Sequence, residues 1–284
     1  MTTTQAHPRI LRAPAVVTGP DRVTRLRRRR IVLPVVAALV LLALWELTVL
    51  VFDLPRYLLP SPVDVAEEFI TNGSSLLMPT LITAIESYLG FLVAGVLGIA
   101  IGITLSRWLS LELATYPYLV LIQTIPSVAI APLLVVWLGA GIVTNAMVAV
   151  LCSIVPIAVN TLLGLKSTDH NLVELYGLAG ASRLTQMFSL RVPSALPQIL
   201  TGLRIASGAA VIGAIVGEFA AGLGGGQAGL GWVITQNATQ LRTTRVFAAI
   251  IMASLISVVL FAVISLVERR VLSAWHDSAR AHDS

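Results

Sequence analysis

The chain has 284 residues, of which 56% are hydrophobic and only 12% are charged, and its net charge is +5. Soluble domains average about 25% charged residues, so a chain this poor in charge cannot cover a water-facing surface, and the bilayer must be its main solvent. The basic residues gather at the N-terminus and between apolar runs. That placement is typical of topology signals and argues against a nucleic-acid binder.

The N-terminal segment 1–26 is polar and aperiodic, which predicts a disordered cytoplasmic tail. A run of four arginines then precedes the apolar stretch 31–51, an order that is also seen in signal peptides. The stretch is too long for the hydrophobic region of a signal peptide, and no small-x-small cleavage site follows it. We therefore expect a retained first span.

A membrane-spanning helix needs about 20 mostly apolar residues. Six segments meet this requirement, namely 31–51, 81–105, 117–138, 142–165, 199–217 and 246–267. They predict an all-α polytopic membrane helix bundle that forms one transmembrane domain, 27–272, followed by a cytoplasmic tail at 273–284. The uncharged run between Tyr116 and Leu165 is too long for one span, so we expect it to turn at Gly139-Ala140-Gly141.

The placement of charges predicts the orientation through the positive-inside rule. The N-terminal segment is rich in arginine and the loop after the first span is acidic, so the N-terminus is expected in the cytoplasm. Lys166 and Arg269 then fall inside, which places the C-terminus in the cytoplasm as well. Arg242 and Arg245 fall outside and break the pattern.

The cytoplasmic segment 166–198 carries the signals of a short helix–turn–helix. One of residues 167–169 fits an N-cap, and Gly180 fits the C′ position that ends a helix. Ser182 fits the cap of a second helix, and Pro193 is expected to close the region. Such a knob on the membrane surface is suited to docking in a partner's groove. The alternative, judged on caps alone, is an ordinary amphipathic loop.

The same segment resembles the EAA motif of ATP-binding-cassette importer permeases, which reads E-A-A-x3-G-x9-I-x-L-P. Glu174 and Gly180 match the glutamate and the glycine at the right spacing. Leu190-x-Val192-Pro193 matches I-x-L-P with conservative changes. Leu175 and Tyr176 stand where the motif has two alanines, which is a departure from it.

Further matches narrow the resemblance to the nitrate, sulfonate and taurine group of these permeases, over roughly residues 55–270. They are Leu59-Pro60-Ser61-Pro62, Ile125-Pro126-Ser127, Ala131-Pro132-Leu133, Trp137-Leu138-Gly139, Thr201-Gly202-Leu203-Arg204 and Gly229-Leu230-Gly231.

This resemblance implies the type I importer permease fold, with segment 166–198 as a coupling segment that sits in a groove of a separate cytoplasmic ATP-binding subunit. The residues it assigns to ATPase coupling are Glu174, Leu175, Tyr176, Gly177, Gly180, Ala181, Ser182 and Pro193. It also implies an extracytoplasmic substrate-binding protein and a second permease copy in a homodimer. The expected location is multi-pass, in the lipid of a bacterial inner or plasma membrane.

No motif indicates an enzyme, a metal or a cofactor. Residues 224–229 formally fit GxGxxG, but a membrane span precedes them where a nucleotide-binding fingerprint needs a strand. No GxxxxGK[ST] occurs, so ATP hydrolysis is expected on another chain. Cys152 is the one cysteine and lies in an apolar run, and the four histidines lack metal-ligand spacing.

Polar groups at membrane depth usually face a bundle interior or a cavity. The candidates for the pathway are Gln123, Ser127, Asn145, Asn160 and Glu218. Hydrogen bonding between helices is the alternative for each of them. Two small-residue pairs, Gly98-x3-Gly102 and Gly213-x3-Gly217, allow close helix packing within or between subunits.

The sequence therefore predicts the permease subunit of an ATP-binding-cassette importer. The resemblance favours a small sulfonate, taurine or nitrate as the solute, with a thiamine precursor or riboflavin as the alternative, since no ring of Arg or Lys at membrane depth demands an anion. A stand-alone secondary transporter or channel is the other alternative. It would need intramembrane charges as ion sites, and the two central spans have none.

Overall fold

The structure is a computed structural model that describes residues 20–222 and 229–280, and these residues form helices with no strand. The helices are α1 (Pro20–Val51), α2 (Pro62–Asn72), α3 (Ser74–Arg107), α4 (Leu109–Thr124), α5 (Ser127–Leu138), α6 (Ile142–Lys166), α7 (His170–Leu178), α8 (Arg183–Gln186), a π-helical turn (Met187–Arg191), α9 (Val192–Ala221), α10 (Leu230–Thr239) and α11 (Thr243–Arg280). The chain divides into two units, Met1–Leu54 and Pro55–Ser284, which are described separately.

Five helical stretches of the described residues are long and apolar enough to cross a membrane, and the bent pair α4–α5 brings the number to six if it counts as one span. This confirms the all-α membrane bundle. The third expected span is wrong in its course, because 117–138 is not one straight helix. It breaks after Thr124, and the two pieces meet at 93°.

The first unit contains α1, which starts at Pro20 and includes the expected span 31–51. The helix therefore reaches seven residues into the segment 1–26 that was expected to be disordered, and residues 1–19 lie outside the described part. The stretch Val32–Val51 is apolar and long enough to cross a membrane. Pro34 lies inside this helix.

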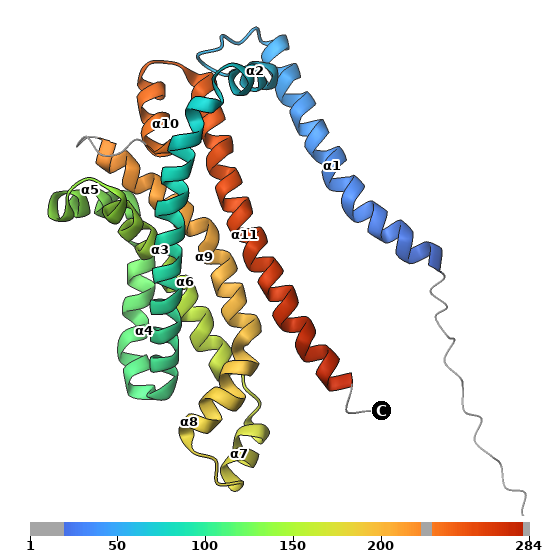
Figure 1. The fold of residues 1–284 in the computed structure, drawn as a ribbon, viewed down its shortest axis with the longest axis vertical. Coiled ribbons are helices and arrows are strands. Elements are labelled where there is room, and N and C mark those ends of the chain that lie inside the picture. Colours follow the sequence, from blue (N-terminus) through green and yellow to red (C-terminus); the bar gives the residue numbers. More distant parts are fainter. Residues whose placement is uncertain (1–19, 223–228, 281–284) are drawn as a thin grey trace, which may run out of the picture. The chain divides into compact units, whose positions relative to one another are not determined.

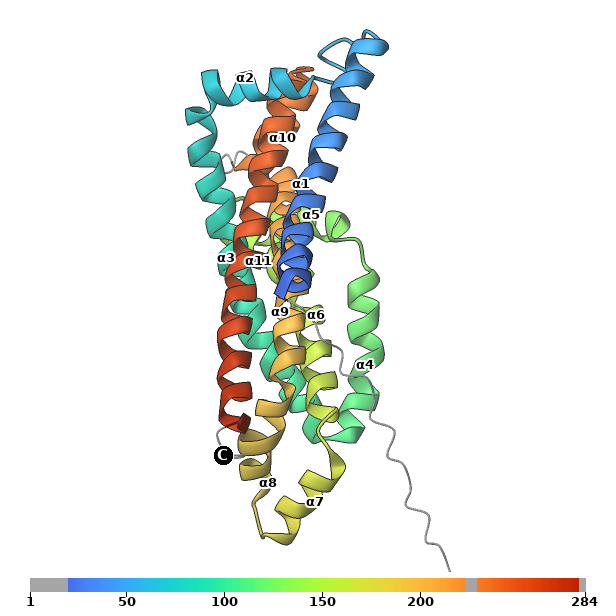
Figure 2. The same cartoon turned by 90° about the vertical axis from the view of Figure 1, so that its right-hand side faces the viewer.

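In the second unit, α3, α6 and α9 lie side by side and form the core (Figures 1 and 2). Small residues bring their backbones together. A Cβ added at Gly98 would lie 2.9 Å from Ile157 Cβ, and one added at Gly213 would lie 2.7 Å from Ala149 Cα. The two glycine pairs thus pack helices within this subunit, which settles a question that the sequence left open.

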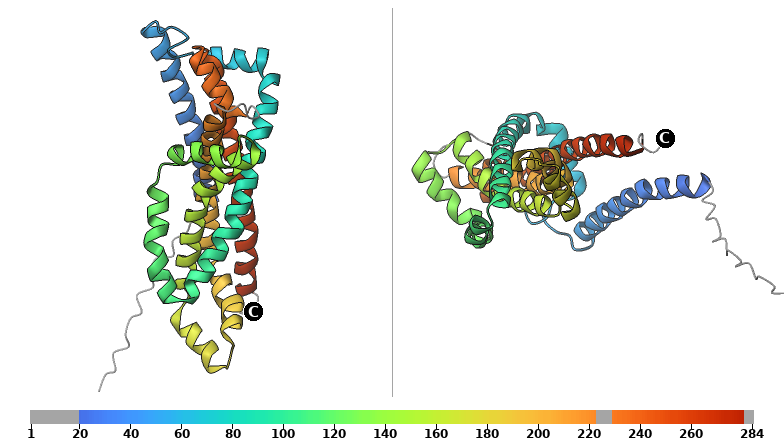
Figure 3. Two further views of the ribbon diagram at one scale, coloured as in Figure 1. Left: turned by 90° about the vertical axis from the view of Figure 1, so that its left-hand side faces the viewer. Right: turned by 90° about the horizontal axis from the view of Figure 1, so that it is seen from below.

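The bend between α4 and α5 has a local cause. Pro126 lacks a backbone N–H, and the residue before a proline is biased away from helical angles; Ile125 accordingly has φ −72° and ψ 123°. The left view of Figure 3 shows α4 running along the bundle and α5 lying across it. The chain then turns into α6 at Gly139, whose φ of +82° favours glycine, as the sequence predicted.

The two ends of the second unit differ. At one end α2 lies across the bundle near α10, and at the other α7 and α8 project from it (Figures 1 and 2). The motif Leu59-Pro60-Ser61-Pro62 starts α2. Ser61 Oγ accepts from the Asp64 N–H at 3.1 Å, while Asp64 Oδ2 accepts from the Ser61 N–H at 3.0 Å. This capping box fixes the direction in which α2 leaves the first loop.

Two helix boundaries differ from those that the sequence predicted. Pro193 does not close the region expected in the cytoplasm, because the helix continues through it from the π-helical turn into α9. The fifth apolar helical stretch therefore runs over Arg183–Ala221 and includes the π-helical turn, instead of starting at 199. At the C-terminus α11 continues to Arg280, so helix covers most of the expected tail 273–284.

Candidate functional site: two ends and a bend

The first candidate site is the knob formed by α7 and α8, and its caps are those that the sequence predicted. Asp169 Oδ1 accepts from the Asn171 N–H at 2.9 Å, and Ser182 Oγ accepts from the Thr185 N–H at 3.1 Å. Gly180 has a φ of +73°. The Ala181 N–H donates to the Tyr176 carbonyl at 3.0 Å. These local bonds hold the turn between the two helices.

Most of this knob is open to a partner. None of the nine residues of α7 is buried, and Leu175 and Leu178 are 59% and 87% exposed. Glu174 forms an ion pair with His170 one turn earlier, at 3.0 Å, and both side chains are exposed. The apolar side chains of this capped helix are therefore free to dock into a groove of a partner.

The second candidate site is a buried polar cluster that joins four helices near the opposite end. Glu86 of α3 and Glu218 of α9 are 0% and 2% exposed. Thr83 donates its hydroxyl to Glu218, which also accepts from the Gly231 N–H of α10. Asn145 of α6 donates to Glu86 Oε1 at 2.8 Å. Buried polar groups at this depth are costly unless paired, so the cluster specifies how these helices meet.

The motif Gly229-Leu230-Gly231 packs directly against this cluster. The Leu230 N–H donates to Thr83 Oγ1 at 2.9 Å. A Cβ added at Gly231 would lie 2.7 Å from Glu218 Oε2 and 2.8 Å from the Ile215 carbonyl oxygen. Only glycine fits here, because any side chain would displace the carboxyl group. The glycine-rich residues just before this motif, 223–228, lie outside the described part.

The third candidate site is a cavity at the break between α4 and α5. Its volume is about 170 Å³, and it is lined by Ile122, Gln123, Ile125, Ser127, Ile130, Leu151, Cys152 and Val155. Gln123 and Ser127, which the sequence assigned to the pathway, therefore share one cavity. No charged side chain lines it, so it offers hydrogen bonds and apolar contact but no counter-charge to an ion.

The other three pathway candidates do not line this cavity. Asn145 and Glu218 belong to the buried polar cluster. Asn160 donates to the Pro156 carbonyl at 2.8 Å, within its own helix, and it lies where α6 meets Gly202 of α9. Two of the five candidates thus line the cavity at the bend, two belong to the buried polar cluster, and Asn160 bonds within α6.

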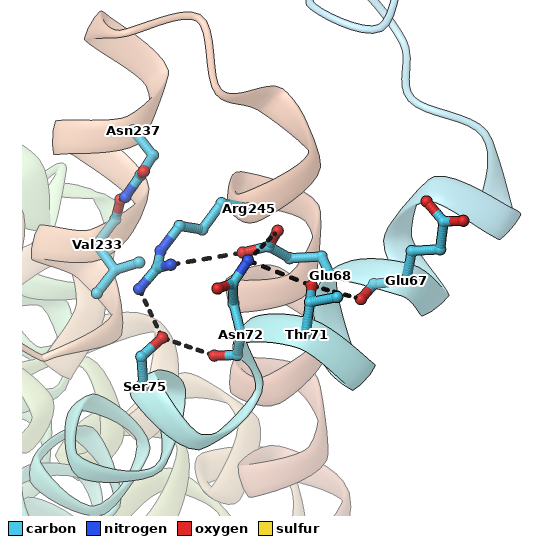
Figure 4. Close-up of polar contacts among 8 residues, drawn as sticks. All are labelled: Glu67, Glu68, Thr71, Asn72, Ser75, Val233, Asn237 and Arg245. Atoms are coloured by element: carbon cyan, nitrogen blue, oxygen red, sulfur yellow. Dashed lines mark hydrogen bonds and ion pairs between the residues drawn. The ribbon is translucent and has the colours of Figure 1, made fainter.

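Among the ion pairs that sequence reasoning missed, two join α11 to other helices of the second unit. Arg204 of α9 pairs with Glu268 of α11, and its guanidinium carbon lies 5.7 Å from the centroid of the Phe261 ring. Arg245 lies 3.5 Å from Glu68 and donates to Ser75 Oγ at 2.8 Å (Figure 4). The second pair explains why Arg245 breaks the charge pattern, because an acidic partner offsets its charge. Spacing gave no signal for either pair, since the partners are far apart in the chain.

The described residues contain no group of three or more His, Cys, Asp or Glu side chains that could hold a metal ion. Of the two buried carboxyl groups, Glu218 accepts from Thr83 and from the Gly231 N–H, and Glu86 accepts from Asn145.

Comparison with known proteins gives consistent matches. The family described as binding-protein-dependent transport system inner membrane component matches residues 94–273. The formylaminopyrimidine transport permease protein ThiX of Halalkalibacterium halodurans is 39% identical over 85% of this chain and 95% of its own. The riboflavin transport system permease protein RibX of Chloroflexus aurantiacus is 35% identical over 86% of this chain and 90% of its own.

The putative aliphatic sulfonates transport permease protein SsuC of Bacillus subtilis is 30% identical over 84% of this chain and 86% of its own. Among solved structures, a chain of the MetNI methionine ABC transporter in an inward-facing conformation aligns with a TM-score of 0.54 at 18% identity. The alignment covers 68% of this chain and 95% of that one, so the two share a fold.

Proposed function

Because the chain belongs to the family of binding-protein-dependent transport system inner membrane components, we propose that it works as one half of a solute pathway and that α7 couples it to a separate cytoplasmic ATP-binding subunit. A chain of this family is a transport component and not an enzyme. The observation that carries the coupling role is the capped and unpacked α7, whose Leu178 is 87% exposed.

In this proposal the two ends of the second unit have separate partners. The ATP-binding subunit meets α7 and α8 in the cytoplasm, with Glu174 and Gly180 at the contact. A substrate-binding protein delivers the solute at the end that carries α2 and α10. Two copies of the chain enclose the pathway in a bacterial plasma membrane, and closure of the ATPase pair switches it between two states.

For the solute, we propose a small molecule that is neutral and forms hydrogen bonds, of the aminopyrimidine kind. The cavity at the bend carries Gln123 and Ser127 but no charged side chain, so it offers a solute hydrogen bonds without a counter-charge. The relative at 39% identity is named for a formylaminopyrimidine. A sulfonate, the solute that the sequence resemblance favoured, lacks a cationic partner in this cavity.

Co-purification tests the coupling role. The tagged full chain is extracted from its own membrane together with its partners, and the amount of accompanying ATPase is compared with that of Glu174→Lys and Gly180→Pro. Gly208→Ala is the matched control, because a Cβ added there meets nothing within 4 Å and Gly208 lies in α9, outside the coupling segment 166–198. Loss of the ATPase in the first two variants alone is the expected result. A parent chain that elutes without an ATPase, yet moves solute in liposomes, overturns the proposal in favour of a secondary transporter.

The solute is tested by ATPase-coupled uptake into proteoliposomes that hold the complete transporter and its binding protein. The uptake of radiolabelled formylaminopyrimidine, riboflavin and taurine is compared, with Ser127→Ala and Gln123→Leu as variants of the cavity. We expect pyrimidine uptake that falls in both variants. Taurine uptake that exceeds pyrimidine uptake would contradict the neutral-solute proposal and leave the coupling role intact.

A further inference from the structure

Three arginines surround one cavity at the end of the bundle that carries α7 and α8. The cavity has a volume of about 290 Å³ and is lined by Ser106, Arg107, Arg183, Gln186, Met187 and Arg191. This volume is several times the ~30 Å³ that one water molecule occupies in the liquid. The cavity therefore has room for a polyatomic group.

The positive charge around this cavity is not offset. Within the part of the chain that the structure describes, none of these three guanidinium groups pairs with a carboxylate. Two acidic residues at the same end have other partners: Glu112 pairs with Lys166 at 2.6 Å, and Glu174 pairs with His170. Guanidinium groups do not lose their proton in proteins. Three such charges around one hollow create a positive potential that attracts an anion.

The two uncharged polar residues that line the cavity donate to backbone carbonyls, so the guanidinium groups are the donors that remain for a ligand. Ser106 donates its hydroxyl to the Ile103 carbonyl at 2.8 Å, and Gln186 donates its amide to the Ala181 carbonyl at 3.2 Å. Arg191 ends the π-helical turn Met187–Arg191. Single π-helical turns occur frequently at functional sites, and this one lies between Arg183 and the regular helix α9.

The cavity lies at the boundary of the apolar helices. Arg107 is the last residue of the apolar helix 74–107, and Arg183 is the first of the apolar stretch 183–221. Trp108 follows directly, with its ring 5.5 Å from the Arg107 guanidinium carbon, and tryptophan is enriched at membrane–water interfaces. Helix α7 contributes no lining residue. The cavity is therefore placed at the level of lipid headgroups, and it shares α8 but not α7 with the proposed ATPase contact.

We propose that this arginine cavity binds a phosphate oxyanion and that its source in the membrane is the headgroup of an anionic phospholipid. The planar fork of arginine matches the oxygens of a phosphate group. Basic pockets between spans on the cytoplasmic side suit such headgroups. The bound headgroup bridges the end of α3 to α8 and the π-helical turn, directly behind the coupling helix.

The test uses the full chain purified with its partner subunits in a neutral detergent. Melting curves are recorded with added phosphatidylglycerol, phosphatidylcholine or inorganic phosphate at constant ionic strength, and retained lipid is measured by native mass spectrometry. The variant is Arg183→Gln combined with Arg191→Gln. The matched control is Arg269→Gln, an exposed arginine at the cytoplasmic end of α11 that does not line the cavity.

We expect phosphatidylglycerol to raise the melting temperature of the parent and of the control, and phosphatidylcholine to leave it unchanged. The double variant should need at least about tenfold more phosphatidylglycerol, because it loses charge-assisted bonds. Equal stabilisation by inorganic phosphate, with no added effect of lipid, identifies free phosphate as the source. Unchanged lipid affinity in the double variant overturns the proposal. So does loss of the ATPase subunit with lipid retained, since the arginines then serve a protein interface.

Discussion

Glu218 shows how single residues decide the geometry of this subunit. Its carboxyl group accepts from Thr83 and from the Gly231 N–H, so one side chain of α9 fixes both α3 and α10. The sequence marked Glu218 only as a candidate for the pathway and marked Gly231 only as part of a family motif. The contact between Glu218 and Gly231 was not predictable. The two residues lie on different helices, so no helical periodicity relates them, and they meet only because α10 folds back onto α9.

Replacing Thr83 by alanine should lower the free energy of unfolding by about 1–3 kcal/mol, because Glu218 loses a donor and the Leu230 N–H loses its acceptor. Thr104→Ala is the control on the same helix. Thr104 is exposed and donates only to the Ala100 carbonyl, so the change there should stay below about 0.5 kcal/mol. Unfolding in mixed micelles with increasing sodium dodecyl sulfate measures both. Equal effects would show that the buried cluster adds no stability.

Gly231→Ala should also destabilise the subunit, by about 1–3 kcal/mol, since the new methyl group meets the Glu218 carboxyl group and the Ile215 carbonyl at under 3 Å. In Gly208→Ala the added Cβ meets nothing within 4 Å, and alanine is the better helix former by about 1 kcal/mol. In the same unfolding assay, Gly231→Ala should therefore lower the free energy of unfolding, whereas Gly208→Ala should raise it. A neutral Gly231→Ala would mean that α10 moves away from Glu218 at no cost.

Among the elements, α6 occupies the centre because it packs on α3 and on α9 through small residues. Hydropathy predicted that α3, α6 and α9 exist, and the spacing of glycines predicted that they pack closely. Hydropathy could not predict the bend between α4 and α5, because the mean hydropathy of a segment does not depend on whether its helix is straight or bent. Pro126 was the local signal for that break. Pro132 and Pro156 carry the same residue type but lie inside regular helices, so proline alone does not tell a bend from a straight span.

The contact between α3 and α6 can be tested with two glycines of one helix. In Gly102→Ala the added Cβ would lie 2.6 Å from Thr161 Cβ and 2.8 Å from the Ala158 carbonyl oxygen, whereas in Gly95→Ala it would meet only Leu203 Cδ2, at 3.7 Å. We expect Gly102→Ala to lower the melting temperature in detergent and Gly95→Ala to leave it unchanged or raise it slightly. The packing interpretation is refuted if Gly95→Ala is the more damaging change.

At the scale of the whole molecule, partner contacts are assigned to opposite ends of the second unit. The helix caps at the α7 end were predictable, since Asp169, Gly180 and Ser182 are local signals that need no tertiary context. The arginine cavity at the same end was not. Its residues come from separate helices, and the sequence showed them only as topology charges. Local chemistry was thus more predictable than any site that needs two helices.

The two ends should respond separately to mutation. Leu178→Asp, on the exposed face of α7, should weaken retention of the ATPase subunit by at least about tenfold without changing the unfolding free energy. Gln236→Lys, at an exposed position of α10, should keep the ATPase and lower its stimulation by the binding protein. Affinity purification and ATPase assays in nanodiscs measure these effects. A loss of both properties in either variant would show that the ends are not separate docking surfaces.

The buried polar cluster also constrains the biogenesis of the subunit. The ribosome releases α3 long before α10, so Thr83 and Glu86 enter the membrane before their partners on α6, α9 and α10 exist. An acidic side chain costs about 2.5–3.5 kcal/mol at the centre of an inserting helix on translocon scales, and Glu86 lies in the first half of α3, nearer its end. Nascent α3 must therefore depend on its long apolar remainder, or on a chaperoned position beside the translocon, until the C-terminal third of the chain arrives. We therefore expect the hydrogen bonds of Thr83 and Glu218 to be complete only after α10 has been synthesised.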